Sequence, residues 1–83
     1  MNCREFNEKY KNYLVENHYG CNLSLPEVIS YLDKEFSSLI KIPFFKYYQI
    51  KMKFNKVRFY ADIISPEKIL EIEEHIEKLY NDE

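Results

Sequence analysis

Apolar and polar side chains alternate along the segment from Tyr48 to Ile63, a pattern that predicts strands with one buried face. The alternation keeps its phase across a two-residue loop at Asn55-Lys56, so we expect a β-hairpin with eight apolar side chains on one side of the ribbon. In that register the facing pairs are Phe54 with Val57, Met52 with Phe59, Ile50 with Ala61, and Tyr48 with Ile63.

The other side of the expected hairpin carries cations and tyrosines. Its members are Tyr47, Gln49, Lys51, Lys53, Arg58, Tyr60 and Asp62. Lysine on the solvent side of a strand also keeps a sheet soluble and discourages edge pairing. The added tyrosines favour a second reading, in which this side contacts a partner molecule.

Helical spacing of apolar residues predicts three helices around the hairpin. The first covers residues 4–18 and ends before Gly20, which we expect to act as its C-terminal cap. A second follows a capping box at Ser24-Leu25-Pro26-Glu27 and stops near Pro43, and a third begins at Ser65-Pro66-Glu67. The predicted fold is therefore one α+β domain over residues 1–83, with two N-terminal helices, a β-hairpin and a C-terminal acidic helix. The helices are expected to pack on one face of the hairpin.

The two cysteines flank the first expected helix. At 1.5 Å per residue, Cys3 and Cys21 would then lie roughly 20 Å apart or more. A disulfide needs Cα atoms within about 7 Å, so we expect two reduced thiols. The sequence shows neither a secretory signal pattern nor a long apolar run, which predicts a cytoplasmic protein without a membrane span.

Charge is divided along the chain although the net charge is only −2. Residues 41–60 hold six basic side chains and no acid, whereas residues 66–83 hold seven acids and two lysines. The acidic helix offers a second candidate surface through Glu71, Glu74 and Glu77, which would compete for a basic groove on another protein.

Catalytic signatures are missing from the sequence. It contains no nucleophile elbow, phosphate-binding loop or metal-ligand repeat. The only histidines, His18 and His75, fall on different expected helices, and Glu71 one turn before His75 is better explained as a solvated helix face. We therefore expect a protein that is not an enzyme and that has no cofactor and no metal site.

The hairpin resembles a pattern found in small phage and prophage proteins, Gln-Val-Lys-Glu-Lys-Phe-Gly-Gly-Leu-Arg-Phe-Tyr. The matching segments here are Gln49-Ile50-Lys51-Met52-Lys53-Phe54 and Val57-Arg58-Phe59-Tyr60, with Asn55-Lys56 in place of the usual glycines. The resemblance implies a phage-encoded accessory protein of the host bacterial cytoplasm. Proteins of this kind bind and inhibit a host protein, such as a nuclease or a defence complex, in the manner of an anti-CRISPR.

Two functions follow as expectations. The first is inhibition of a host protein by stoichiometric contact; the alternative is a small nucleic-acid-binding module that uses the basic, tyrosine-bearing side of the hairpin. The isoelectric point near 5.7 weighs against the alternative. The expected contact residues are Tyr47, Lys51, Lys53, Arg58, Tyr60, Glu71, Glu74 and Glu77. We also expect that the hairpin edge can pair with a second copy to give a homodimer.

Overall fold

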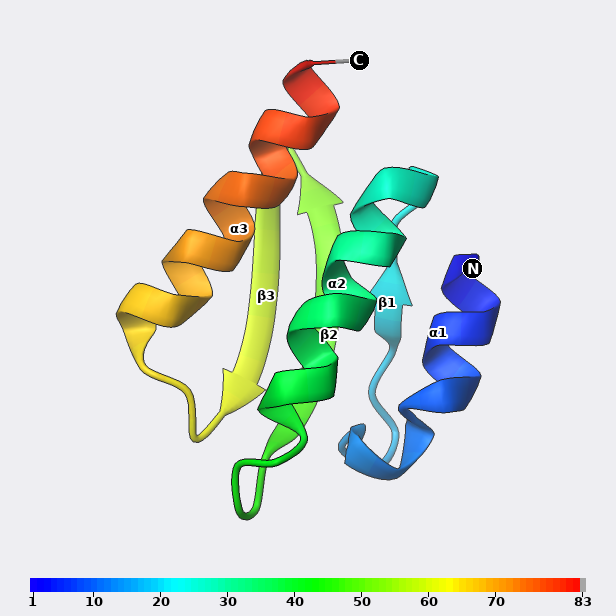
Figure 1. The fold of residues 1–83 in the computed structure, drawn as a ribbon, viewed down its shortest axis with the longest axis vertical. Coiled ribbons are helices and arrows are strands. Elements are labelled where there is room, and N and C mark those ends of the chain that lie inside the picture. Colours follow the sequence, from blue (N-terminus) through cyan, green and yellow to red (C-terminus); the bar gives the residue numbers. More distant parts are fainter. Residues whose placement is uncertain (83) are drawn as a thin grey trace.

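The computed structural model describes residues 1–82 as helices arranged around a three-stranded sheet (Figure 1). Helices α2 and α3 lie across one face of the sheet, and α1 lies beside the short strand β1. The α+β class is confirmed, but the sheet has one strand more than expected. In chain order the elements are α1 (Cys3–Lys9), the 3₁₀ helix η1 (Lys11–Tyr13), β1 (Gly20–Asn22), α2 (Pro26–Leu39), β2 (Lys46–Lys53), β3 (Lys56–Asp62) and α3 (Pro66–Asn81).

The N-terminal segment does not form the single helix expected over residues 4–18. Helix α1 ends at Lys9, and the chain then passes through η1 into β1. The cause is pairing with β2: the Val15 N–H donates to the Tyr47 carbonyl at 2.9 Å, and Leu14 forms an isolated bridge to Tyr47. Apolar periodicity does not report such long-range backbone bonds. Gly20 therefore begins a strand, with φ of +73°, and does not cap a helix.

Strand β1 completes the sheet, whose order is β1-β2-β3. It runs parallel to β2, with Cys21 opposite Ile50, and β2 runs antiparallel to β3. Parallel neighbours need a crossover connection, and here α2 supplies it by crossing the covered face between β1 and β2.

The hairpin forms, but its turn lies one residue earlier than expected. Phe54 and Asn55 are the two turn residues, and both have positive φ, 52° and 62°, as a type I′ turn requires. Asn55 thus fills the second turn position, not the first. Ile50 consequently faces Phe59, and Met52 faces Val57. Each predicted partner on β2 is displaced by two residues, an even number that keeps these four residues on the same face of the sheet. Ile50, Val57 and Phe59 are buried there, whereas Met52 is exposed.

A β-bulge reverses the faces at the start of β2. The register shifts between Tyr47 and Gln49, so that Tyr47 points into the core and is fully buried. The expectation that Tyr47 faces a partner is therefore wrong. Four residues expected in the core lie outside it: Tyr48 is the bulged residue, Phe54 occupies the turn, Ile63 lies beyond the end of β3, and Met52 near the turn is 36% exposed.

The core is one cluster centred on the ring of Phe36, which is fully buried. This ring connects all layers of the fold, because its neighbours come from α1, β2, β3 and the loop before β2. By the general cost of removing a buried aromatic, Phe36→Ala would lower stability by about 3–5 kcal/mol. The five aromatic rings within 6 Å of its centroid are Phe6, Tyr10, Phe45, Tyr47 and Phe59.

Both edges of the sheet are covered by side chains of helices. On β3, the Val57 N–H donates to Glu77 at 2.9 Å and the Phe59 N–H donates to Glu73 at 2.8 Å. On β1, the Asn7 amide accepts the Cys21 N–H at 2.7 Å and donates to the Cys21 carbonyl at 2.9 Å. Two N–H groups of β3 and both backbone groups of Cys21, which a further strand would use, are thus already bonded.

The cysteines lie side by side, contrary to the expected separation. The Cys3 thiol donates to the Cys21 carbonyl at 2.6 Å, because α1 packs against β1 once the long helix is broken. Both thiols are free. Burial is the main cause that raises the pKa of the Cys21 thiol well above its ordinary value, so this sulfur stays protonated and unreactive.

Candidate functional site: the open face of the sheet

The face of the sheet opposite α2 and α3 carries four of the eight residues that the sequence marked for partner contact. Outward side chains of β2 and β3 alternate with the buried ones, and the helices lie on the other side (Figure 1). We call this surface the open face. It consists of Tyr48, Gln49, Lys51, Lys53, Lys56, Arg58, Tyr60 and Asp62.

Cations stand directly opposite one another on the open face. Lys51 faces Arg58, and Lys53 faces Lys56, across the two strands. Like charges at facing positions destabilise a sheet. Within residues 1–82 only Lys56 of these four has an ion pair, at 3.9 Å from Glu77. The hairpin therefore keeps a positive surface at a cost to its own stability.

A pocket of about 720 Å³ opens at one end of this face. The loop before β1 supplies His18 and Tyr19, and the strands supply Tyr48, Lys51 and Tyr60 among others. We call it the open-face pocket. Its complete lining is His18, Tyr19, Tyr48, Gln49, Lys51, Phe59, Tyr60, Ala61, Asp62 and Ile69.

The β-bulge orients one wall of the pocket. It turns Tyr48 outward, where its hydroxyl donates to a carboxylate oxygen of Asp62 at 2.6 Å. That hydrogen bond is the main cause that raises the pKa of the Tyr48 phenol above its ordinary value. The His18 ring packs edge-on against Tyr48 with ring centroids 4.8 Å apart. These contacts give the loop before β1 a fixed position beside the sheet.

Most of the acidic candidates on α3 have bonds within the protein. Glu77 covers the edge of β3, and Glu71 lies 3.6 Å from Lys68, which also contacts Glu35 at 3.2 Å. Of the three predicted glutamates, Glu74 alone has no such bond among the described residues. The acidic helix is therefore a weaker candidate surface than the open face.

Helix α3 also packs its histidine against α2. The His75 ring stacks on Tyr31 with centroids 4.0 Å apart and planes 17° apart. Burial, followed by the charges of Glu35 and Glu71, raises the pKa of Tyr31 to about 12. This pair joins the two helices on the covered side and lies apart from the open face.

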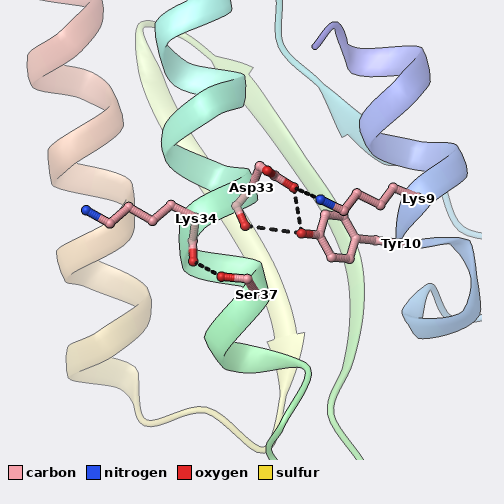
Figure 2. A network of polar contacts seen from close by, with 5 residues as sticks. All are labelled: Lys9, Tyr10, Asp33, Lys34 and Ser37. Carbon is pink, nitrogen blue, oxygen red and sulfur yellow. Dashed lines mark hydrogen bonds and ion pairs between the residues drawn. The ribbon is translucent and has the colours of Figure 1, made fainter.

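A second polar network joins α1 to α2 (Figure 2). The buried Tyr10 hydroxyl donates to the Asp33 carboxylate at 2.6 Å and to the Asp33 carbonyl at 3.1 Å, and Lys9 contacts the same carboxylate at 2.8 Å. Hydrogen bonds from Lys9 and then Tyr10 lower the pKa of Asp33. Nearby, the Ser37 hydroxyl donates to the Lys34 carbonyl at 2.6 Å. The bonds of Asp33 to Tyr10 and Lys9 fix the position of α1 against α2.

The alternating pattern of β2 and β3 predicted part of this site. The structure brings Lys51, Lys53, Arg58 and Tyr60 together on one surface as expected. It removes Tyr47 and adds Lys56, Tyr48, His18 and Tyr19. The adjacent pair Tyr47-Tyr48 gave no signal for the bulge, because either tyrosine satisfies the alternating pattern.

Metal binding and membrane insertion receive no support from the described residues. Over residues 1–82, no group of three or more His, Cys, Asp or Glu side chains is arranged to hold a metal ion. None of the helices in that range is long and apolar enough to cross a membrane.

Comparison of the chain with protein-family models, with curated proteins and with solved structures finds no match.

Proposed function

We propose that the protein is a phage-encoded inhibitor that binds an acidic surface of a host protein in a stoichiometric complex through the open face. The supporting observation is that two pairs of cations face one another across β2 and β3, and that Lys51, Lys53 and Arg58 have no ion pair with a carboxylate within residues 1–82. Carboxylates on a partner would relieve this repulsion and would speed association.

The covered edges of the sheet support a face-on mode of binding. An added strand would have to displace Glu73 and Glu77 from β3, or Asn7 from β1. The same bonds disfavour the homodimer through the hairpin edge that the sequence suggested. Exposed aromatic surface at Tyr60 and Tyr19 supplies the apolar contact that an interface needs besides charge.

The proposal is tested by capture of the tagged protein with its partner from the host, under nuclease treatment. A variant with Lys51, Lys53 and Arg58 all changed to Gln should lose the partner, because its attraction to carboxylates is removed. Glu74→Gln, an exposed change on α3, is the matched control and should retain it. Purified partner should then lose its activity at one equivalent of the protein. Equal capture by the triple variant would contradict the proposal.

A single-stranded nucleic acid is the second candidate partner. It is favoured by one observation, the placement of Tyr48 and Tyr60 among cations on an uncovered sheet, where bases stack and phosphates bind. Oligonucleotide titration at several salt concentrations tests it. Binding that weakens with salt, and weakens further in the triple variant, would support this candidate. Absence of binding at low salt would exclude it and leave the host protein as the partner.

A further inference from the structure

We propose that the open-face pocket binds a nucleotide, with the base held between tyrosine rings and the phosphate held by Lys51. The pocket shares a surface with the proposed protein partner, but this site stands on separate observations. Its volume of about 720 Å³ lies within the roughly 300–1,000 Å³ of small-molecule sites.

Aromatic walls define the first part of the ligand. The side chains of Tyr19 and Tyr60 are 77% and 48% exposed, so large ring surfaces remain available to a ligand. A flat, π-bonded group such as a nucleobase fits tyrosine walls, because every base offers a face for stacking.

Charges in the lining define the second part. Lys51 faces the cation Arg58, whereas Asp62, four residues further along β3, faces Lys46. Four residues of strand span roughly 13 Å. The lining thus holds a cation and a carboxylate separated along the strand. A ligand that complements both has an anionic group near Lys51 and hydrogen-bond donors near Asp62.

Asp62 is held in place by a hydrogen bond and can accept hydrogen bonds from a ligand. Tyr48 donates to one of its oxygens at 2.6 Å, and an ionised carboxylate has about four acceptor sites, so capacity remains for a ligand. A base amino group or a ribose hydroxyl is a suitable donor. Gln49 adds an amide that both donates and accepts.

Other ligand classes satisfy fewer of these groups. Inorganic phosphate would use Lys51 but none of the tyrosine rings, and a basic peptide would be repelled by Lys51 and Arg58. A nucleoside without phosphate would use the rings and Asp62 but would leave the cation unpaired. A nucleotide, either free or at the end of a single strand, satisfies all three features.

Calorimetric titration with adenosine and uridine monophosphates tests the site, with two-dimensional NMR to locate the shifted amides. Tyr60→Leu keeps apolar contact but removes stacking, and should weaken binding roughly fivefold to a hundredfold. Lys51→Gln should weaken binding of the monophosphate and leave binding of the nucleoside unchanged. Lys34→Gln is the matched control, because Lys34 is an exposed lysine of α2 that lies outside the pocket and outside the open face.

The possible outcomes separate the sources of the ligand and the two proposals. Tighter binding of a short oligothymidylate than of a monophosphate would support the site and assign it to a strand end, whereas equal affinities assign it to a free nucleotide. No binding at millimolar nucleotide, or binding that ignores both Tyr60→Leu and Lys51→Gln, would overturn the site. Neither result decides whether the protein captures a host protein, because that capture also depends on Lys53 and Arg58, which lie outside the pocket.

Discussion

The hydroxyl groups of two buried tyrosines differ in their hydrogen bonds, so removal of each should affect stability differently. The Tyr10 hydroxyl has two hydrogen bonds to Asp33, whereas the Tyr47 hydroxyl is buried with no partner among the described residues. Tyr10→Phe should therefore lower the free energy of unfolding by about 1–2 kcal/mol, and Tyr47→Phe should leave it unchanged or raise it. Urea denaturation measures both. A loss of more than about 1 kcal/mol in Tyr47→Phe would show that this hydroxyl has a bound water partner.

Gly20 occupies a position that a larger residue cannot enter without strain. Its φ is +73°, and a Cβ atom there would lie 2.6 Å from Oδ1 of Asn7, the oxygen that accepts the Cys21 N–H. We expect Gly20→Ala to lower stability by about 2 kcal/mol or more. Asn22→Ala, at an exposed position of the same strand, is the control for thermal denaturation. A similar stability in both variants would contradict the geometry.

Asp33 makes stability depend on pH. Its pKa in the folded protein lies below the ordinary value of 3.8, because Lys9 and Tyr10 bond its charged form. The stabilisation is therefore complete above the ordinary value and is lost as the pH falls through the lowered one. Asp33→Asn should remove this part of the slope when urea midpoints are plotted against pH. Parallel curves for the two proteins would count against it.

At the scale of the element, α3 covers the edge of β3 with two carboxylates. Glu73→Ala and Glu77→Ala should each lower stability by about 1–2 kcal/mol, because the Phe59 and Val57 N–H groups lose their partners. Hydrogen exchange at these two amides should become faster.

The exposed Glu74 on the same helix provides the control, since Glu74→Ala removes no bond to the strand. The double variant at Glu73 and Glu77 should also associate with itself in sedimentation experiments, because its strand edge is free. A monomeric double variant with unchanged exchange would refute the role of these glutamates.

Element types were predictable wherever the determinants are local. Ser65 caps α3 as its sequence predicts, and Pro26 begins α2. The capping box expected at Ser24 is wrong, because Leu25 is the N-cap residue of α2 and no side chain caps this helix. The register of the hairpin was not predictable, because Asn55 is acceptable at either turn position. Asn55 takes the second position, which places Phe54 in the turn with a strained, positive φ. Strand β1 was not predicted for another reason. It has only three residues, which are too few for an alternating pattern, and its partners on β2 lie about 29 positions further along the chain.

For the whole molecule, the open face implies a conflict between stability and binding. Lys53→Glu would place a carboxylate opposite Lys56, and we expect a gain of about 0.2–1 kcal/mol in stability. The same change should weaken binding of the partner to the open face. Arg4→Glu, an exposed charge reversal on α1, controls for net charge alone. A stability loss in Lys53→Glu would show that the cations do not repel one another.

The candidate site was predictable as a surface but not as a pocket. Alternation identified Lys51, Arg58 and Tyr60, since strand residues two apart share a face. It could not identify His18 and Tyr19, because their position depends on where the first helix ends and on the contact with Tyr48. Pockets built from a loop and a distant strand need tertiary information.

Asn7 closes one side of the sheet from the first helix, and Glu73 and Glu77 close the other from the last. The width of the sheet is thus fixed by the two outermost helices of the described chain. A protease that cut between α1 and β1, or between β3 and α3, could separate a covering helix from its strand. The backbone groups of that edge would then be free to pair with strands of other copies, which is how fibres begin. Resistance of these two connections to cleavage is therefore a condition for keeping the protein in solution.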